Sequence, residues 1–334
     1  MAQIGEIANG IVGHESPISR LRKLLDADKL PTAMLFVGPE GIGKKIVAKF
    51  VAQYYVCENQ NACGKCGKCV RILNEQSEDV FFLKPDGDFL KIEVVREALQ
   101  FLSLKALARG KFVIIDNADA MTMQAANALL KSLEEPPANT FFILISANPL
   151  RLLATIRSRC QIHRFQPLSL SDVHAVLIRH GDTAGTVEEW MLRASEGRCG
   201  KILRWTQGGG ERLRDKAFTF VRVLLDPSWP PSFLSISDVV ENKIEAQDMI
   251  NLVLQILRDS YLFAFGLREQ IIHSDRSERL AEFAKAGPKT LVRVWQKALR
   301  LENDLESPMD LKLSLENLYF ESRAALSAPL YALD

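Results

Sequence analysis

Short apolar runs alternate with segments of helical period through the first half of the chain. Five of these runs have the length and apolar content of strands: residues 32–37, 80–84, 111–115, 141–145 and 161–165. Strands that alternate with helices along the chain are typical of a parallel sheet covered by helices on both faces. We therefore expect an α/β domain over residues 1–166.

The pattern changes after Pro167, where helical period continues but strand signals stop. Three short helical segments follow, at residues 171–180, 187–196 and 200–206. They predict a small three-helix lid over residues 167–207.

Three glycines at 208–210 then interrupt the helical pattern, and we expect a hinge there because glycine breaks regular structure. From residue 211 onward only helical period is found, which predicts an all-helical domain over residues 211–334. One apolar stripe in it recurs at helical spacing: Met249, Leu252, Val253, Ile256 and Leu257. Such a stripe indicates a core or a subunit contact rather than a cofactor site.

The composition is that of an ordinary globular protein, since 47% of the 334 residues are hydrophobic and 25% are charged. A formal net charge of +1 argues against tight autonomous binding to nucleic acid, which needs a basic surface. Any contact with DNA is therefore expected to be shared with partners. The chain starts without a signal segment and has no apolar run of membrane-spanning length, which predicts a cytoplasmic protein without a membrane partner.

A phosphate-binding loop is predicted directly after the first strand. Its residues match the P-loop pattern G-x-x-x-x-G-K up to the last position: Gly38-Pro39-Glu40-Gly41-Ile42-Gly43-Lys44-Lys45. Glycines let backbone N–H groups surround a phosphate at a helix N-terminus, and Lys44 would reach the β- and γ-phosphates. The last position should be Ser or Thr, whose hydroxyl binds Mg²⁺, but the Lys45 ammonium has no lone pair to give. The loop therefore has the shape of a phosphate site without its magnesium anchor.

A second ATPase-like sequence places Asp116 and Asn117 after the apolar run 111–115. In an active enzyme the aspartate helps to hold magnesium, and an adjacent glutamate polarises the attacking water as an anionic base. Asn117 stands in the glutamate position and is a neutral amide. An apolar run that ends in Asp is weak evidence alone, but together with the upstream loop it favours a P-loop fold that has lost hydrolysis.

Four cysteines form an independent signal: Cys57, Cys63, Cys66 and Cys69, in the pattern C-x5-C-x2-C-x2-C. Four thiolates at such short spacing suit a tetrahedral structural zinc and leave no open position for catalysis. Disulfides are the alternative, but a reducing cytosol disfavours them. Cys160 and Cys199 stand apart and are expected to be ordinary buried thiols.

On these motifs and on further blocks the chain resembles the bacterial AAA+ clamp-loader subunits of DNA polymerase III. The blocks are residues 11–15 (IVGHE), 101–104 (FLSL), 125–137 (AANALLKSLEEPP), 158–160 (SRC) and 257–259 (LRD). The 125–137 stretch is the most specific of them. The resemblance implies an AAA+ P-loop domain, a helical lid and a C-terminal helical collar that mediates oligomerisation. It also implies a zinc module inserted at 57–69, although the family's first cysteine gap is usually longer.

Two further positions depart from the active members of that family. Ala147 falls where the sensor-1 polar residue would stand, and Gly200 falls where the sensor-2 arginine would stand. With Lys45 and Asn117, four ATP-handling positions have changed together. The combination favours the delta-prime type of clamp-loader subunit over the tau/gamma motor type.

Arg159 lies in the Ser-Arg-Cys block before the last predicted strand. An arginine at such a place is commonly a surface charge or an ion-pair partner. The resemblance implies instead that Arg159 is catalytic in trans, facing the γ-phosphate bound by the next subunit. A guanidinium suits that role because it stays charged when partly desolvated and grips two phosphate oxygens.

The function implied by the resemblance is that of a delta-prime-type subunit, which helps to load the sliding clamp onto primer-template DNA during replication. Its expected partners are the tau/gamma and delta subunits, the clamp, and DNA through the complex. The chain alone is expected to hydrolyse no ATP, and whether its own site holds ATP or ADP stays open. The alternatives are an active tau/gamma-type motor, against which Lys45 and Asn117 count, and a AAA+ remodelling chaperone, whose aromatic pore loop we do not find.

Overall fold

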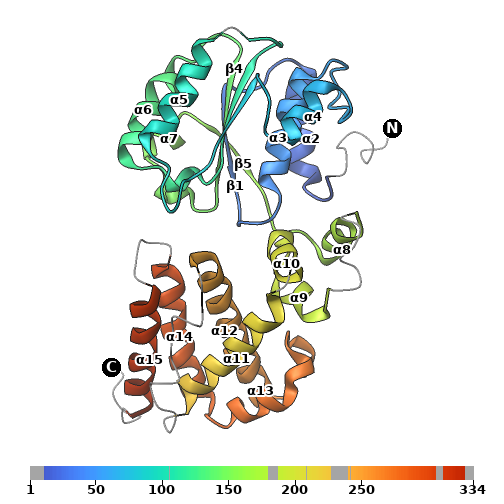
Figure 1. The fold of residues 1–334 in the computed structure, drawn as a ribbon. Helices are drawn as coiled ribbons and strands as arrows, with labels where there is room; N and C mark the ends of the chain where they lie inside the picture. The colour runs from blue at the N-terminus through green and yellow to red at the C-terminus, as the bar shows by residue number, and fades with distance from the viewer. Residues whose placement is uncertain are drawn as a thin grey trace. The chain divides into compact units, whose positions relative to one another are not determined.

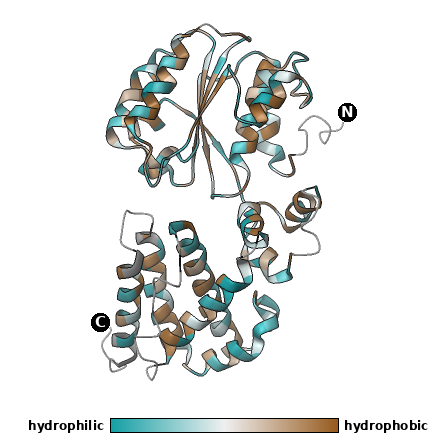
Figure 2. Ribbon diagram, viewed as in Figure 1, coloured by the Kyte–Doolittle hydropathy of each residue, from teal (hydrophilic) through white to brown (hydrophobic). Residues whose placement is uncertain are grey.

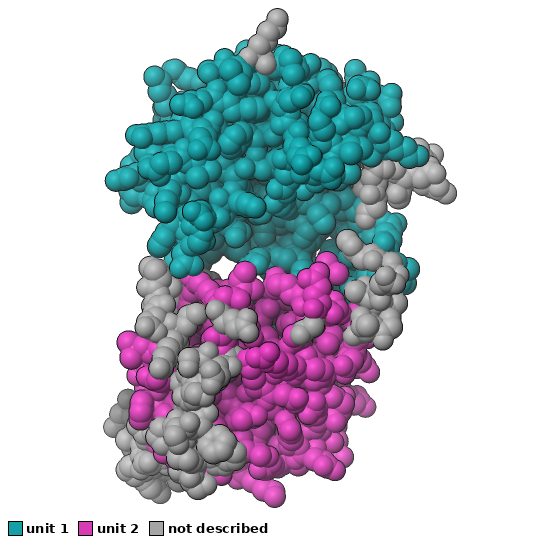
Figure 3. All heavy atoms as spheres, viewed as in Figure 1, with its two compact units in different colours: residues 1–185, 196–200 teal, residues 186–195, 201–334 magenta. Residues whose placement is uncertain are grey.

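The computed structural model describes residues 11–104, 106–179, 187–207, 209–226, 240, 242–305 and 311–327. The chain divides into two compact units, Met1–Gly185 with Glu196–Gly200, and Thr186–Ser195 with Lys201–Asp334 (Figure 3). The boundary between these units therefore runs through the segment predicted as the lid. The expected division into three domains stays a prediction.

A parallel five-stranded sheet forms the centre of the first unit, with the strand order β2-β3-β4-β1-β5 (Figure 1). The strands are β1 Ala33–Val37, β2 Val80–Leu83, β3 Lys111–Ile115, β4 Thr140–Ser146 and β5 Gln161–Arg164. All five predicted strands are confirmed, with ends shifted by at most one residue. β1, β3 and β4 are buried along their whole length because they lie inside the sheet with both faces covered, whereas the edge strand β5 buries only His163.

Seven helices belong to the described part of the first unit. They are α2 Glu15–Asp26, α3 Lys44–Val56, α4 Gly67–Leu73, α5 Ile92–Ser103, α6 Met123–Glu134, α7 Ala154–Arg157 and α8 Leu170–Arg179. Figure 1 shows α2, α3 and α4 on one side of the sheet and α5, α6 and α7 on the other. Each side has its own buried apolar cluster, with Phe36 and Val51 in the first and Leu35 and Leu129 in the second. The two clusters follow from the alternation of side chains along each strand.

Parallel pairing fixes where the candidate site lies. β1 pairs with β4, and β4 pairs with β3, so the carboxyl ends of these three strands lie at the same edge of the sheet. The predicted phosphate loop follows β1, Asp116 follows β3 and Ala147 follows β4. Ligands of such sheets bind outside the carboxyl ends of the strands.

The second unit is helical, and no strand is found among its described residues. Its helices are α9 Glu189–Ala194, most of α10 Cys199–Thr206, α11 Gly210–Leu225, α12 Lys243–Ala264, α13 Ser277–Ala284, α14 Pro288–Asp304 and α15 Leu311–Ser327. α12 packs against α11, α13 and α14. Along the helices, hydrophobic residues alternate with hydrophilic ones (Figure 2), as expected of helices with one buried face.

The predicted apolar stripe belongs to α12 and forms part of the core of this unit. Met249, Val253 and Ile256 are fully buried there, so the stripe is a core feature. Of the predicted glycine hinge, Gly208 lies outside the described residues, and Gly210 is the first residue of α11. A Cβ on Gly210 would come within 2.7 Å of the Trp205 side chain, so glycine allows the close passage from α10 to α11.

A buried polar group lies in the same core. Asp259 of α12 accepts hydrogen bonds from the backbone N–H groups of Ile272 at 2.9 Å and His273 at 2.8 Å. The His273 ring is fully buried beside Trp190 and Phe218, and neither ring nitrogen has a hydrogen-bond partner among the described residues. Burial lowers the pKa of His273 to about 3.

No helix within the described ranges is long and apolar enough to cross a membrane.

Candidate functional site

Two glycines give the predicted phosphate loop its shape. Gly43 is the N-cap of α3 with φ 100°, a left-handed conformation that favours glycine, and a Cβ placed there would touch nothing within 4 Å. A Cβ on Gly38 would come within 2.4 Å of the Phe165 carbonyl oxygen, so only glycine allows that approach. Gly43 therefore leaves open space at the start of α3, where the backbone N–H groups of a phosphate loop would meet their ligand.

The loop is fixed from the segment before β1. His14 lies at the N-cap of α2, and its Nε2 is 2.7 Å from the carbonyl oxygen of Ile42. The His14 ring also meets Phe165 edge-on at 5.2 Å between centroids. Residues 11–15, one of the blocks of the family resemblance, thus support the loop directly.

Lys44 is the first residue of α3 and is almost fully buried, with 6% of its surface exposed. Its Nζ donates hydrogen bonds to the carbonyl oxygens of Gly38 at 2.5 Å and Pro39 at 2.6 Å. Burial lowers its pKa to about 8, although the nearby carboxylates of Glu40 and Asp116 act in the opposite direction. Lys44 therefore lies within the loop, where a P-loop lysine binds phosphate.

Lys45 connects three parts of the first unit. Its Nζ lies 2.8 Å from Glu75 Oε1, just beyond α4, and 3.5 Å from Asp116 Oδ2 at the end of β3. Lys49, one turn later in α3, pairs with the same Glu75 oxygen at 2.9 Å. Burial raises the pKa of Glu75, but the two lysines outweigh it and hold the pKa below its usual value. Position 45 therefore lacks the hydroxyl that would bind magnesium, and it places the ammonium of Lys45 beside the Asp116 carboxylate instead.

Asn117 follows Asp116 in a left-handed conformation, φ 48°, and its side chain is exposed. Its backbone N–H lies 3.2 Å from Asp116 Oδ1, so it supports the aspartate. Ala147 is exposed directly after β4 and has no polar group to offer. Next to it Ser146 is fully buried, and the N–H of Gly38 donates to its carbonyl oxygen at 3.3 Å.

Gly200 lies against the phosphate loop. Its N–H donates to the carbonyl oxygen of Gly41 at 2.9 Å, and a Cβ would lie 2.9 Å from the Gly41 Cα. The close approach leaves no room for an arginine side chain at this position in the present arrangement. Position 200, where active members of the family would have the sensor-2 arginine, is thus occupied by a glycine that packs directly against the loop.

Arg159 lies away from the phosphate loop, after α7. Its guanidinium forms an ion pair with Glu134 at the end of α6 and donates to the carbonyl oxygen of Thr155 at 2.8 Å. About a third of its side chain, 34%, is exposed. The ion pair with Glu134 does not exclude a contact of Arg159 with another subunit. Both side chains of the pair are at the surface, so the guanidinium is accessible from outside the chain.

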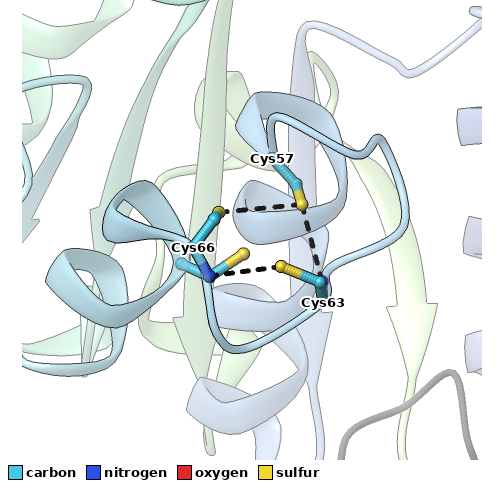
Figure 4. Close-up of side chains that lie close together, drawn as sticks. Cys57, Cys63 and Cys66 are labelled. Atoms are coloured by element: carbon cyan, nitrogen blue, oxygen red, sulfur yellow. Dashed lines mark hydrogen bonds between the residues drawn. The ribbon is translucent and has the colours of Figure 1, made fainter.

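The four cysteines predicted to bind metal lie together at the end of α3 and the start of α4. Their four sulfur atoms all lie within 4.8 Å of one another. The Sγ atoms of Cys57 and Cys66 are 3.9 Å apart (Figure 4). A tetrahedral zinc with Zn–S bonds of about 2.3 Å sets its sulfurs about 3.8 Å apart, so the cluster fits that ion.

Backbone N–H groups support thiolates in this cluster. The N–H of Cys63 lies 3.5 Å from the sulfur of Cys57, and that of Cys66 lies 3.3 Å from the sulfur of Cys63 (Figure 4). Hydrogen bonds from the backbone of Lys65 and Cys66 lower the pKa of the Cys63 thiol to about 6. The donor set, four soft sulfur ligands, is one that zinc prefers. Cys160 and Cys199 lie outside the cluster, and burial raises the pKa of each to about 11.

Two residues of this region, Glu75 and Glu134, belong to the site although no sequence signal marks them. Glu75 lies beyond the cysteine motif, and its role depends on how α4 packs beside α3. Glu134 belongs to the 125–137 block, but nothing in the chain pattern indicates that it pairs with Arg159. Both are carboxylates paired over long sequence distances, which local patterns do not reveal.

Two known families and several known proteins are similar to this chain. The family described as "DNA polymerase III, delta subunit" matches residues 13–169, and "DNA polymerase III, delta subunit, C terminal" matches residues 230–322. DNA polymerase III subunit delta' of Bacillus subtilis is 30% identical over 284 residues, which cover 79% of this chain and 83% of that protein.

Two more relatives match over different extents. Subunit delta' of Pseudomonas aeruginosa is 41% identical over 134 residues, or 38% of this chain and 41% of that protein. DNA polymerase III subunit tau of Salmonella typhimurium is 26% identical over 96% of this chain, which spans about half of that protein, 55%.

Proposed function

This chain belongs to the family of DNA polymerase III delta-prime subunits, and from that premise we propose that it acts in a clamp loader that places the sliding clamp on primer-template DNA. Its partners in that complex are the tau/gamma and delta subunits and, through the assembly, the clamp and DNA. The helical second unit supplies the collar contacts. The net charge of +1 agrees with DNA contact that is shared among subunits.

The observation that carries the proposal for the chain's own site is the position of Lys45. Its ammonium lies 3.5 Å from the Asp116 carboxylate, which in an active P-loop ATPase helps to hold magnesium. Asn117 offers no carboxylate to polarise water. The loop glycines and Lys44 are retained, so the chain binds nucleotide through residues 38–44. It does not hydrolyse this nucleotide, because it has neither a magnesium anchor nor a base.

Arg159 acts in trans in this proposal. Its exposed guanidinium leaves the surface pair with Glu134 and contacts the γ-phosphate held by an adjacent tau/gamma subunit. A surface pair of this kind contributes at most about 1 kcal/mol, so its exchange for a phosphate costs little. A bound γ-phosphate offers the guanidinium two oxygens and a larger charge than one carboxylate.

The cysteine cluster holds one structural zinc. Four thiolate ligands close the coordination sphere, so the metal supplies folding energy and takes no part in ATP chemistry. Gln53 of α3 donates to the carbonyl oxygen of Cys69 at 2.9 Å, which ties the module to the helix that starts at the phosphate loop.

The alternative is an active motor of the tau/gamma type, favoured only by the intact loop glycines, Lys44 and the tau similarity. The test is ATP hydrolysis by the purified chain with and without DNA and clamp. We expect no activity above background in either condition. Hydrolysis that disappears in Lys44→Ala would establish the motor instead.

A further inference from the structure

Lys45 occupies the P-loop position that normally binds magnesium through a hydroxyl. One ammonium there joins the helix after the loop to Asp116 at 3.5 Å and to Glu75 at 2.8 Å. We propose that Lys45 is a built-in cation that replaces magnesium, so that this site takes a nucleoside di- or triphosphate without its metal. The inference rests on the proposed function, in which the chain's own site binds nucleotide without hydrolysis.

Asp116 is the carboxylate that magnesium would need at this site. Asp116 already has the Lys45 ammonium beside it, and the second partner of that ammonium, Glu75, is shared with Lys49 at 2.9 Å. A magnesium ion at Asp116 would have to displace Lys45 or remain within a few ångströms of a like charge. Lys45 has only 30% of its side chain exposed, so water screens that repulsion incompletely.

The charges at the start of α3 also affect which form of the nucleotide binds. Lys44 and Lys45 are consecutive at the start of α3, where the helix dipole and the free N–H groups also favour anions. A free nucleotide carries two more negative charges than its magnesium complex. Because the Lys45 ammonium offsets the charge of Asp116, the site favours the free form, whereas a hydroxyl at position 45 would leave Asp116 to magnesium and favour the complex.

The Lys45 side chain is also held in place. Glu75 receives both Lys45 and Lys49, and Lys49 also donates to the carbonyl oxygen of Leu73 at 2.9 Å. This network links α3 to the end of α4 and keeps the Glu75 carboxylate charged. Lys45 is thus oriented by two carboxylates rather than extended into solvent.

The same contacts would also be made by an ordinary surface ion pair. The two interpretations differ in one measurable property, the effect of magnesium on nucleotide affinity. The decisive experiment titrates the full chain with ADP and with ATP by isothermal calorimetry, once in EDTA and once in excess Mg²⁺. Circular dichroism of each variant checks that it is folded.

We expect the unmodified chain to bind both nucleotides about tenfold more tightly in EDTA than in magnesium. Lys45→Thr restores the hydroxyl and should reverse this preference. Lys45→Met should weaken binding in EDTA and abolish the preference. Lys23→Met is the control, because Lys23 is an exposed lysine of α2 outside the network of Lys45, Glu75 and Lys49, and it should keep the preference of the unmodified chain.

Tighter binding in magnesium, or the same metal dependence in Lys45→Met as in the unmodified chain, would overturn the inference. The absence of nucleotide binding in both conditions would overturn it as well. None of these results affects the delta-prime assignment, because assembly with tau/gamma and delta subunits is measured separately by mass analysis of the complex. A chain that binds free nucleotide but does not assemble would contradict the proposed function alone.

Discussion

Replacing Arg159 by alanine separates its surface ion pair from its proposed action in a neighbouring subunit. In the isolated chain the change removes the pair with Glu134, whose two side chains are 34% and 48% exposed, and one hydrogen bond to Thr155. An exposed pair contributes about 0–1 kcal/mol, so the variant should unfold at nearly the same temperature as the unmodified chain. Assembly with the other subunits should be preserved.

The effect on catalysis should be far larger. An arginine finger is worth about 10³ to 10⁵ in rate at the site that it completes. In a ring with several active sites, the complex should lose only the share of its ATPase that depends on this interface. Clamp loading should fall further if the sites act together. Arg159→Lys should rescue poorly, because an ammonium cannot make the forked contact.

The assay is clamp- and DNA-stimulated ATP hydrolysis by the reconstituted complex, with clamp loading measured in parallel. Glu134→Ala breaks the same ion pair but keeps the guanidinium, so it should retain the activity. Arg109, which forms an exposed pair with Asp28 at 2.9 Å, is a matched surface control. Arg159 has no role in trans if Arg159→Ala assembles normally and the complex hydrolyses ATP and loads clamps at the unmodified rate.

Three further results are expected. Cys66→Ser should remove the zinc measured by elemental analysis and lower the melting temperature, whereas Cys160→Ser, outside the cluster, should keep one zinc per chain. Nucleotide affinity measured by calorimetry should fall between pH 7 and 9, because Lys44 loses its charge as the pH rises through its pKa of about 8, and Lys44→Met should lack this dependence. His273→Leu should raise the free energy of unfolding in urea by about 1–3 kcal/mol, because it removes two buried ring nitrogens without partners. This gain in unfolding free energy should grow by up to about 1.4 kcal/mol per pH unit as the pH falls below 6.5. The reason is that His273 takes up a proton in the unfolded chain but not in the folded one, where its pKa is about 3. An equal gain at pH 7 and 5.5 would contradict this pH dependence.

The sheet could be predicted from the sequence because each strand is a short apolar run, and parallel inner strands are buried on both faces. The glycine geometry of residues 38–45 and the gathering of the four cysteines were also predictable, since residues 38–45 and 57–69 each fold within one local segment. In both cases the spacing along the chain largely determines the spacing in space.

The partners of the key cations were not predictable. Lys45 meets Glu75 only because the cysteine module folds back along α3, and Arg159 meets Glu134 only because α6 and α7 pack together. Neither contact has a periodic or motif signal. The place where the chain divides into compact units likewise depends on packing among α9, α10 and the later helices, which the helical period alone does not encode.

The central claim is that this chain is needed for clamp loading although its own site does not hydrolyse ATP. The most direct measurement is clamp loading on primer-template DNA by tau/gamma and delta subunits reconstituted with no added chain, with the unmodified chain or with Lys44→Ala. We expect no loading without the chain and substantial loading with either form of it. Loading without the chain, or ATP hydrolysis by the purified chain that Lys44→Ala abolishes, would show that this role is wrong.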